Sequence, residues 1–393
     1  PKLVEVGRHL NINIITNSEV ESLEGKPGNF RATLRSTPRY NDPDVCTGCG
    51  QCSQACPING INEYDCGLNL KAATSIQYAQ AIPMAYTIDR AICIGCGLCE
   101  KVCLAEAIRY DEKPKMAEIE VGAVILAVGN EVYDPSVMDT YSYSQSPNVV
   151  TSMEFERILS ASGPYMGHLM RPYDREEPKK IAWLQCVGSR DTQKCSNPYC
   201  SAVCCMYAIK EAVIAMEHAH GEVEETIFYM DMRTHGKDFE NYYDRARDEH
   251  GVRFIRSRVH TVDPLEDGDL QIRYIDDSGE LKEEVFNLVV LSVGFQVSKE
   301  TKELAERLGI DLNRNNFART GSFEPVATSR PGIFVCGTLQ GPKDIPQSVV
   351  ESSAAAAASS VLLSESRWTE TKDIKLPPER NVVGDPTRIG AFV

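Results

Sequence analysis

Two runs of cysteines have the spacing that binds iron–sulfur clusters. The first reads Cys46-x2-Cys49-x2-Cys52-x3-Cys56-Pro57, and the second repeats it as Cys93-x2-Cys96-x2-Cys99-x3-Cys103. Three thiolates two residues apart can wrap one four-iron cube, while a short helical turn carries the fourth to the other cube. The spacing therefore predicts one 4Fe–4S cluster on Cys46, Cys49, Cys52 and Cys103, and a second on Cys93, Cys96, Cys99 and Cys56.

Zinc sites or disulfides are the alternative for these eight thiols. Zinc ribbons use paired cysteines with a long gap, so two runs of four favour iron–sulfur binding. Leu104 stands where proline follows the first run, but this position shapes the turn and supplies no ligand. Cys66 lies alone in an excursion around Asn62–Pro83, and we interpret it as a spare thiol.

A third group of cysteines is irregular. Its members lie within twenty residues, between a predicted strand ending at Gln185 and a predicted helix starting near Cys204: Cys186, Cys195, Cys200, Cys204 and Cys205. A helix N-terminus offers free N–H groups and a partial positive charge, which suit an anionic thiolate-bound cluster. Adjacent side chains diverge by about 100° on a regular helix, so Cys204 and Cys205 bind one cluster only if the first turn is irregular. Buried reduced cysteines are the alternative.

The loop before this helix is a poor nucleotide-binding loop. It reads Gln185-Cys186-Val187-Gly188-Ser189-Arg190, with one glycine where a dinucleotide-binding turn has G-x-G-x-x-G. Because side chains keep a phosphate from the backbone, the sequence disfavours nicotinamide nucleotide binding in the usual manner.

Several strand ends are typical of flavoproteins with two dinucleotide-binding domains. Gly129 and Gly294 end predicted strands, and Gly332–Gly337 precedes a helix rich in small residues. Thr338 stands where such proteins have Asp for the ribityl chain, and Lys343 or Asp344 could compensate. The glycine loop for the FAD pyrophosphate is absent, and we expect it upstream of Pro1.

Composition excludes several classes of protein. The chain has 393 residues, 42% hydrophobic and 25% charged, with a net charge of −15. Disorder, collagen and a small disulfide scaffold do not fit these values, and no apolar run is long enough to span a membrane. Acidity without a Lys/Arg block argues against nucleic acid as the main partner; it indicates a solvated surface or a docking face for basic partners. Fifteen cysteines, an odd number, favour a reducing cytoplasm.

The remaining sequence predicts a doubly wound parallel sheet. Residues 1–39 read as two β segments, Ile12–Thr16 and Phe30–Leu34, around a turn at 24–28. Further on, apolar strands alternate with amphipathic helices, which indicates a parallel α/β arrangement. The predicted strands are Glu120–Val128, which looks like a central one, Lys180–Gln185, Glu225–Met230, Val252–Arg256, Gln271–Ile275, Leu288–Val293 and Gly332–Cys336. The predicted helices are Cys204–His220, Lys299–Leu308 and Gln347–Leu363.

Taken together, these motifs closely resemble the A subunit of heterodisulfide reductase, an iron–sulfur flavoprotein family of anaerobic microbes. The resemblance rests on both four-cysteine runs, on Gln185–Asp191, on Asn197–Ser201 with Cys204–Lys210, and on Gln340–Pro346. It implies an α/β fold: a two-dinucleotide-binding-domain, thioredoxin-reductase-like flavoprotein with an inserted 2×4Fe–4S ferredoxin domain.

The resemblance also implies cofactors and their residues. The cofactors are FAD and three 4Fe–4S clusters, the third held by Cys186, Cys200, Cys204 and Cys205, with Cys195 left spare. Lys210 maps to a lysine beside flavin N5, where a cation would stabilise reduced anionic flavin; the alternative is a solvated helix lysine. The other expected flavin contacts are Val20, Gly129, Cys336, Gly337, Thr338, Lys343, Asp344, Ile345 and Gln347.

The expected domains follow from the same comparison. Residues 1–39 end a first FAD-domain segment, 40–113 form the inserted ferredoxin domain (hereafter the insert), and 114–178 return to the FAD domain as a connector. Residues 179–297 form an NAD-domain-like unit, 298–366 the C-terminal FAD segment, and 367–393 a linker. Because the chain starts at Pro1, we read it as beginning inside a larger polypeptide. Arg388–Val393 resembles the opening strand of a following unit, or is a chance β-like tail.

The implied function is electron distribution in a heterodisulfide-reductase-like complex. Such a protein would divide electrons, by flavin bifurcation, between a disulfide-type acceptor branch and ferredoxin. Its partners would be the B and C subunits, a hydrogenase or formate dehydrogenase linked through a small iron–sulfur subunit, ferredoxin and a second copy of itself. A passive relay, as in sulfate reduction or aromatic-CoA reduction, is the main alternative. A pyridine-nucleotide-dependent disulfide reductase ranks last, because Cys200-x3-Cys204 has the wrong spacing.

Overall fold

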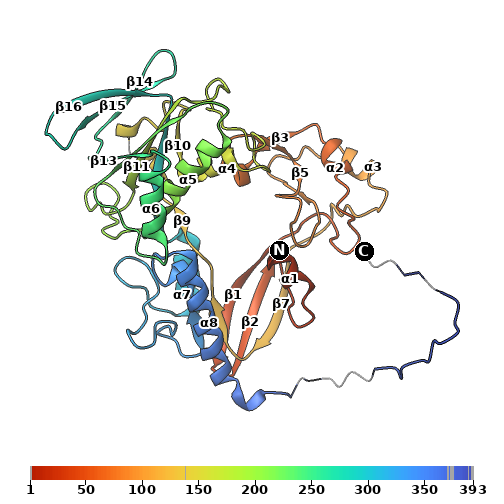
Figure 1. Cartoon of the computed structure of the whole chain (residues 1–393). Coiled ribbons are helices and arrows are strands. Elements are labelled where there is room, and N and C mark those ends of the chain that lie inside the picture. The colour runs from red at the N-terminus through yellow and green to blue at the C-terminus, as the bar shows by residue number, and fades with distance from the viewer. Residues whose placement is uncertain (1, 138, 370, 372–375, 388, 391–393) are drawn as a thin grey trace.

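The computed structural model describes residues 2–137, 139–369, 371, 376–387 and 389–390. Figure 1 shows a three-stranded sheet beside the N-terminus, the insert to one side of it, and a larger α/β region on the other side. Within the described residues, no helix is long and apolar enough to cross a membrane.

The three-stranded sheet is antiparallel, in the order β1-β2-β7. Strands β1 (Ser18–Lys26) and β2 (Asn29–Ser36) form a hairpin, and β7 (Lys115–Val121) pairs with β2 after the chain has passed through the insert. The expectation for Phe30–Leu34 is confirmed, but the β segment at Ile12–Thr16 is wrong. Helix α1 (Lys2–Arg8) precedes this stretch instead, and the strand begins only at Ser18, where pairing with Ser36 becomes available.

The predicted central strand Glu120–Val128 is also wrong. The structure divides it between β7 and the short β8 (Val124–Leu126), which pairs in parallel with β19 (Ile333–Val335). Gly122 lies at the break, where an added Cβ would come within 2.3 Å of the Leu363 side chain. An apolar run alone does not show that its two ends belong to different sheets.

A five-stranded parallel sheet forms the centre of the larger region. Its order is β10-β17-β11-β12-β13, which confirms the predicted parallel α/β arrangement, although over the residues described helices cover one face and not both as in a doubly wound sheet. The strands are β10 (Val149–Thr151), β17 (Leu288–Val293), β11 (Lys180–Val187), β12 (Glu224–Tyr229) and β13 (Arg253–Arg256).

Different elements cover the two faces of this sheet. Helices α4 (Ser152–Leu159), α5 (Cys204–His218) and α6 (Phe239–Asp248) enclose one apolar core with Trp183 at its centre. The other core is closed by an antiparallel meander of β14 (Val262–Pro264), β15 (Leu270–Ile275) and β16 (Leu281–Phe286). Predicted strand Gln271–Ile275 therefore exists, but it lies outside the parallel sheet.

A capping box starts α4 immediately after β10. Thr151 Oγ1 accepts a hydrogen bond from Glu154 N at 3.2 Å, and Glu154 Oε2 accepts one from Thr151 N at 2.6 Å. Because the cap satisfies N–H groups of the first turn, T151A should lower the free energy of unfolding by about 1 kcal/mol. Denaturant unfolding would measure this loss, with T192A at an exposed loop position as the control. Equal stability of the two variants would contradict the capping role.

Helix α7 (Lys299–Leu308) matches its predicted bounds because both of its ends are marked locally. Ser298 Oγ accepts from Thr301 N, and Gly309 adopts a left-handed φ of 65° at the C-cap. Helix α8 (Ile345–Leu362) begins two residues before the prediction, with Asp344 as its N-cap. Together with β8 and β19, α7 encloses a separate small core.

The insert contains short elements and is tied to α4. It holds α2 (Gln51–Gln54), α3 (Leu98–Lys101) and two small hairpins: β3 (Asn59–Ile61) with β4 (Leu70–Ala72), and β5 (Thr74–Ser75) with β6 (Thr87–Ile88). The buried carboxylate of Asp65 accepts from Arg157 Nη2 at 2.6 Å, and the Arg157 guanidinium lies 4.7 Å from the Tyr64 ring centre. These contacts join the insert to α4 across 92 residues of sequence.

Two short strands and the C-terminal part complete the description. Strand β9 (Glu131–Val132) pairs with β18 (Phe295–Gln296) and links the two main regions. The described residues 376–387 and 389–390 hold no helix or strand. The expected strand at Arg388–Val393 lies largely outside the described residues.

Candidate functional site

The thiols predicted to hold the first cluster lie close together in the insert. Burial raises the pKa of Cys52 to about 11, and the neighbouring thiols of Cys46, Cys49 and Cys103 act in the same direction. Cys103 thus joins the first run from the end of the second, as the crossed pairing requires. Ligation of iron by these thiols stays a prediction.

The second predicted set shares the core of the insert. Cys52 and Cys99 are buried side by side in one cluster of residues, with Cys93 and Cys103 packed against it. Tyr110 Oη lies 3.1 Å from Cys99 Sγ, so the phenol can donate to a thiolate at that position. Cys66 lies away from these sets, next to Asp65, Glu154 and Arg157.

Glycines turn the backbone between the ligands. Gly50 and Gly97 precede α2 and α3 with left-handed φ values of 81° and 75°, and Gly48 and Gly95 have φ of 68° and 71°. Because L-residues rarely adopt this conformation, glycine is the residue that lets the chain turn between closely spaced thiols.

The third group converges on a small pocket at the start of α5. Cys186, Cys200, Cys204 and Cys205 line it, and we call it the Cys186 pocket. Cys204 and Cys205 are the first two helical residues, and the loops before them contain left-handed backbone at Cys186 and Ala202, with φ of 63° and 64°. The irregular backbone therefore lies before the helix, whereas the first turn, which was expected to be irregular, is helical from Cys204.

Each thiol in this pocket has a donor nearby. Ala202 N donates to Cys200 Sγ at 3.3 Å, and Arg190 Nη1 lies 4.0 Å from Cys186 Sγ. Burial raises the pKa of Cys205 to about 11, while the Arg233 backbone N–H lowers it. Burial likewise raises the pKa of Cys204, and the nearby Tyr207 hydroxyl opposes this shift. These donors would stabilise thiolates, the form that binds iron.

Cys195 is separated from the four. Its Sγ donates to Asp191 O at 3.3 Å, and its side chain packs against the core on the meander side of the sheet. This position is consistent with the spare role expected for it.

No group of three Cys, His, Asp or Glu side chains in the described part of the chain converges at the spacing of a single metal ion. A 4Fe–4S cluster takes one thiolate at each iron and holds its ligands farther apart than a single ion does.

The loop glycine Gly188 lies against an aromatic ring of the same chain. An added Cβ at Gly188 would come within 2.1 Å of Tyr133 Cγ, and Tyr133 is buried. The space over this glycine is therefore filled by Tyr133, which supports the expectation of no usual nucleotide site. Gly294 meets the same loop, because a Cβ there would lie 2.0 Å from Ser189 Oγ.

A larger cavity adjoins the Cys186 pocket. It has a volume of about 910 Å³ and is lined by Lys210 of α5 and by Asp344, Ile345 and Pro346 at the start of α8. We call it the Lys210 cavity. Apolar and aromatic side chains form much of its wall: Leu159, Met206, Tyr207, Ile214, Phe239 and Tyr242.

Two residues separate the cavity from the thiols. Ala202 and Val203 line both the Lys210 cavity and the Cys186 pocket. Tyr207 also lines the cavity, and its Oη donates to Val293 O at 2.6 Å, the same carbonyl that accepts from Cys204 Sγ at 3.7 Å. A ring in the cavity would thus lie beside a group held by the four cysteines.

The other expected flavin residues gather mainly around β19 and the start of α8. The Gly337 N–H donates to Glu351 Oε2 at 3.1 Å, and the buried Lys343 ammonium is paired with the same carboxylate. Asp344 caps α8 by accepting from Gln347 N at 2.8 Å. Ile345 is exposed, and Cys336 is buried beside α8, whereas Val20 and Gly129 lie apart, on β1 and after β8. Thr338 is in the 3-10 turn Gly337–Leu339.

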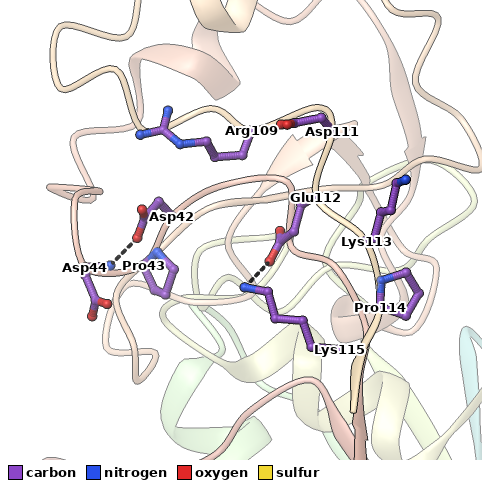
Figure 2. A pocket seen from close by; sticks show the side chains of 9 residues that line it. All are labelled: Asp42, Pro43, Asp44, Arg109, Asp111, Glu112, Lys113, Pro114 and Lys115. Carbon is purple, nitrogen blue, oxygen red and sulfur yellow. Dashed lines mark hydrogen bonds and ion pairs between the residues drawn. The ribbon is translucent and has the colours of Figure 1, made fainter. Parts of the chain in front are cut away.

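A further hollow lies at the stem of the insert. Figure 2 shows Asp42, Pro43 and Asp44 on one side of it and Lys113, Pro114 and Lys115 on the other, with a volume of about 700 Å³. Asp44 N donates to Asp42 Oδ1, and Lys115 pairs with Glu112 at 3.9 Å. Within the described chain, none of the predicted ligands or flavin contacts lines this hollow.

Comparison with known proteins assigns the two kinds of domain. Residues 208–357 match the family described as pyridine nucleotide-disulphide oxidoreductase, and residues 40–62 and 86–109 match the 4Fe-4S binding domain. The chain is 45% identical over 373 residues to the A subunit of the H(2)/formate:CoB-CoM heterodisulfide,ferredoxin reductase of Methanococcus maripaludis, covering 94% of this chain and 56% of that protein. The chain is homologous to the A subunit of heterodisulfide reductase.

Other relatives agree with this assignment. The iron-sulfur A subunit 2 of the CoB--CoM heterodisulfide reductase of Methanopyrus kandleri is 45% identical, covering 92% of this chain and 56% of that protein. The A subunit of the ferredoxin:CoB-CoM heterodisulfide reductase of Methanosarcina acetivorans is 38% identical, covering 93% and 49%. The chain therefore spans about half the length of the curated relatives it matches. Thioredoxin reductase of Lactococcus lactis overlaps with 75% of this chain and 86% of that one, at 16% identity and a TM-score of 0.41.

The matches confirm the fold class and the resemblance to the family of heterodisulfide reductase A subunits. The α/β part is that of an oxidoreductase family, and the insert carries 4Fe-4S binding segments. Domain boundaries and individual site residues stay predictions.

Several residues around the Cys186 pocket were not predicted from the sequence. Arg190 was identified only as part of a loop, while Asp231 and Arg233, which follow β12, were not singled out. Tyr133 and Tyr207 were missed as well. In the sequence, these residues are marked only by a position after a strand end or next to a cysteine. Many residues with no part in a site share such a position.

Proposed function

We propose that this chain is the FAD- and iron–sulfur-containing A subunit of a heterodisulfide-reductase-like complex. In this role it distributes electrons between a disulfide-type acceptor branch and ferredoxin. The proposal is supported by homology over more than nine-tenths of the chain and by the names of the relatives, which include hydrogen, formate and ferredoxin.

The observation that carries the proposal is the shared wall between the Lys210 cavity and the Cys186 pocket. A flavin is a planar aromatic ring with a polar pyrimidine edge, and it can accept two electrons and pass them on singly. The cavity wall combines aromatic and apolar side chains with a lysine and a helix N-terminus, and these suit both parts of such a ring. Ala202 and Val203 then leave only a thin partition before the thiols.

Electrostatics in the cavity favour a negatively charged guest. The N-terminal end of α8 contributes a partial positive charge beside Asp344–Pro346, with the Asp344 carboxylate accepting from Gln347 N at 2.8 Å. Glu211 lines the same cavity and accepts from Trp183 Nε1 at 2.9 Å. Burial raises the pKa of Glu211 well above its ordinary value, which lessens the negative charge that this carboxyl places in the cavity with Lys210.

Replacing Lys210 tests the flavin site. K210M removes a cation that would stabilise anionic reduced flavin, so the flavin midpoint potential should move to a more negative value, by an amount equivalent to roughly a tenfold change in affinity for the reduced form. The measurement is a spectroscopic redox titration of the full-length protein purified anaerobically with its flavin.

The matched control is K302M on α7, which does not line the cavity. It should keep the wild-type potential. A K210M protein that binds flavin at the wild-type potential would show that Lys210 is a solvated helix lysine.

Bifurcation is the finer part of the proposal, with the B and C subunits, a hydrogenase or formate dehydrogenase, and ferredoxin as the proposed partners in the cytoplasm. In the purified complex, a bifurcating flavin takes up its two electrons in one apparent step. Two well-separated one-electron steps would instead support a non-bifurcating relay, as in sulfate or aromatic-CoA reduction. Size analysis of the complex would show whether it contains two copies of this chain.

A further inference from the structure

A charged triad lines the Cys186 pocket together with the four thiols. Arg190 comes from the loop after β11, and Asp231 and Arg233 come from the segment after β12. These segments meet because β11 and β12 are neighbours in the parallel sheet and end at the same edge. The triad is therefore positioned by the sheet itself.

Asp231 fixes both arginines. Its Oδ1 is paired with Arg190 Nη1, and its Oδ2 accepts from Arg233 Nε at 3.3 Å and Nη2 at 3.2 Å. The Arg190 and Arg233 side chains are 24% and 36% exposed. Their charges are thus partly shielded from water. A charge in such a place has a larger effect on a neighbouring charge than one at the surface has.

The charge of the triad faces the thiols. Arg190 Nη1 is 4.0 Å from Cys186 Sγ, and the Arg190 charge lowers the pKa of that thiol against the effect of burial. Two guanidinium groups against one carboxylate leave an excess of one positive charge beside the pocket. The insert has the opposite charge, because its residues 40–113 include nine acidic and five basic side chains.

We propose that Arg190 and Arg233 raise the reduction potential of the cluster held in the Cys186 pocket, and that Asp231 limits this increase. The inference rests on the proposed function. When one electron passes from reduced flavin to this cluster, the cluster gains one negative charge and no bond to cysteine is made or broken. Cations beside the thiolates stabilise that product, whereas the acidic insert disfavours the same gain of charge. The triad thereby makes the cluster in this pocket the acceptor of higher potential, which receives one of the two flavin electrons.

Opposite charge changes test the proposal. In the full-length protein, purified anaerobically with its clusters, R190Q should lower the ratio of reduced to oxidised cluster at a fixed potential by about tenfold. For a one-electron couple, this corresponds to a shift of about 59 mV toward more negative values. D231N should shift the midpoint potential in the positive direction. An EPR-monitored redox titration measures both, using the signal that is absent from C204S.

Two controls separate charge from structure. R190K keeps the charge and should stay near the wild-type potential, and R256Q changes an exposed arginine that donates only to Met230 O at the end of β13. If R190Q loses iron, the midpoint potentials of R190K and D231N are compared with that of the wild type instead. Equal potentials in all variants, or shifts of R190Q and D231N in the same direction at full iron content, would overturn the proposal. A wild-type protein without iron in this pocket would instead overturn the proposed function.

Discussion

Serine in place of Cys204 is expected to remove about four irons per chain and leave the clusters of the insert in place. Cys204 is 5% exposed at the first position of α5, beside Cys205 and facing Cys186 and Cys200. Burial raises the pKa of this thiol, so without metal it is neutral. Bound iron deprotonates it, and serine replaces the soft sulfur by a hard oxygen that binds such a cluster weakly.

Iron and acid-labile sulfide per chain measure this effect in anaerobically purified protein. About twelve irons in the wild type and about eight in C204S would match three clusters and two. C195S is the matched control from the same cysteine-rich stretch, because Cys195 bonds to Asp191 O and lies outside the pocket. An equal loss of iron from C195S and C204S would contradict the assignment of ligands.

The second large effect is expected at Glu225, where E225Q should stabilise the folded protein by about 3 kcal/mol at pH 7. Glu225 is 1% exposed on β12, and neither carboxylate oxygen has a hydrogen-bond partner among the described residues. Burial raises the pKa of Glu225 from its ordinary 4.5 to about 9. At neutral pH, folding must therefore keep a proton on a group that is ionised in the unfolded chain.

The sign of the pH dependence follows from proton binding. Between pH 4.5 and about 9 the folded state binds more protons at Glu225 than the unfolded state does, so stability falls as pH rises through this window. One pKa unit corresponds to 1.36 kcal/mol, which over the interval up to pH 7 gives about 3 kcal/mol. Below pH 4.5 the effect vanishes, because both states are protonated.

Thermal unfolding at pH 5 and pH 8 measures the prediction. The midpoint of E225Q should exceed that of the wild type by a margin that grows from pH 5 to pH 8. E224Q is the control, since Glu224 is exposed and its pairing with Lys180 at 3.4 Å is at the surface. A margin that is the same at both pH values would show that Glu225 is ionised in the folded protein.

Local sequence patterns predicted the parts of the molecule that depend on local chemistry. The cysteine spacing indicated which thiols meet in the insert, because a ligand run is short and its turns are set by Gly48, Gly50, Gly95 and Gly97. Likewise, the bounds of α7 depend on neighbouring residues, the Ser298 cap and Gly309. In both cases, the residues that define the structure lie within a few positions of one another.

Contacts between distant segments explain most of what the sequence did not predict. The run Glu120–Val128 has no polar residue after Glu120, and only pairing with β2 and with β19 divides it. Asp231 and Arg233 reach the thiols because β11 and β12 are neighbours, a pairing that no local pattern encodes. The antiparallel meander was missed for a similar reason, since its strands look like any others in the alternation.

The ring of Tyr133 over Gly188 has a consequence for reading glycine-rich loops. A glycine after a β-strand is usually taken to leave space for a bound nucleotide, yet here a side chain of the same protein fills that space. Adding further glycines to this turn would not by itself create a dinucleotide site, because the aromatic ring would still fill the place of the pyrophosphate. Conversion of this scaffold to a nicotinamide-dependent enzyme would have to begin at position 133, 55 residues before the glycine.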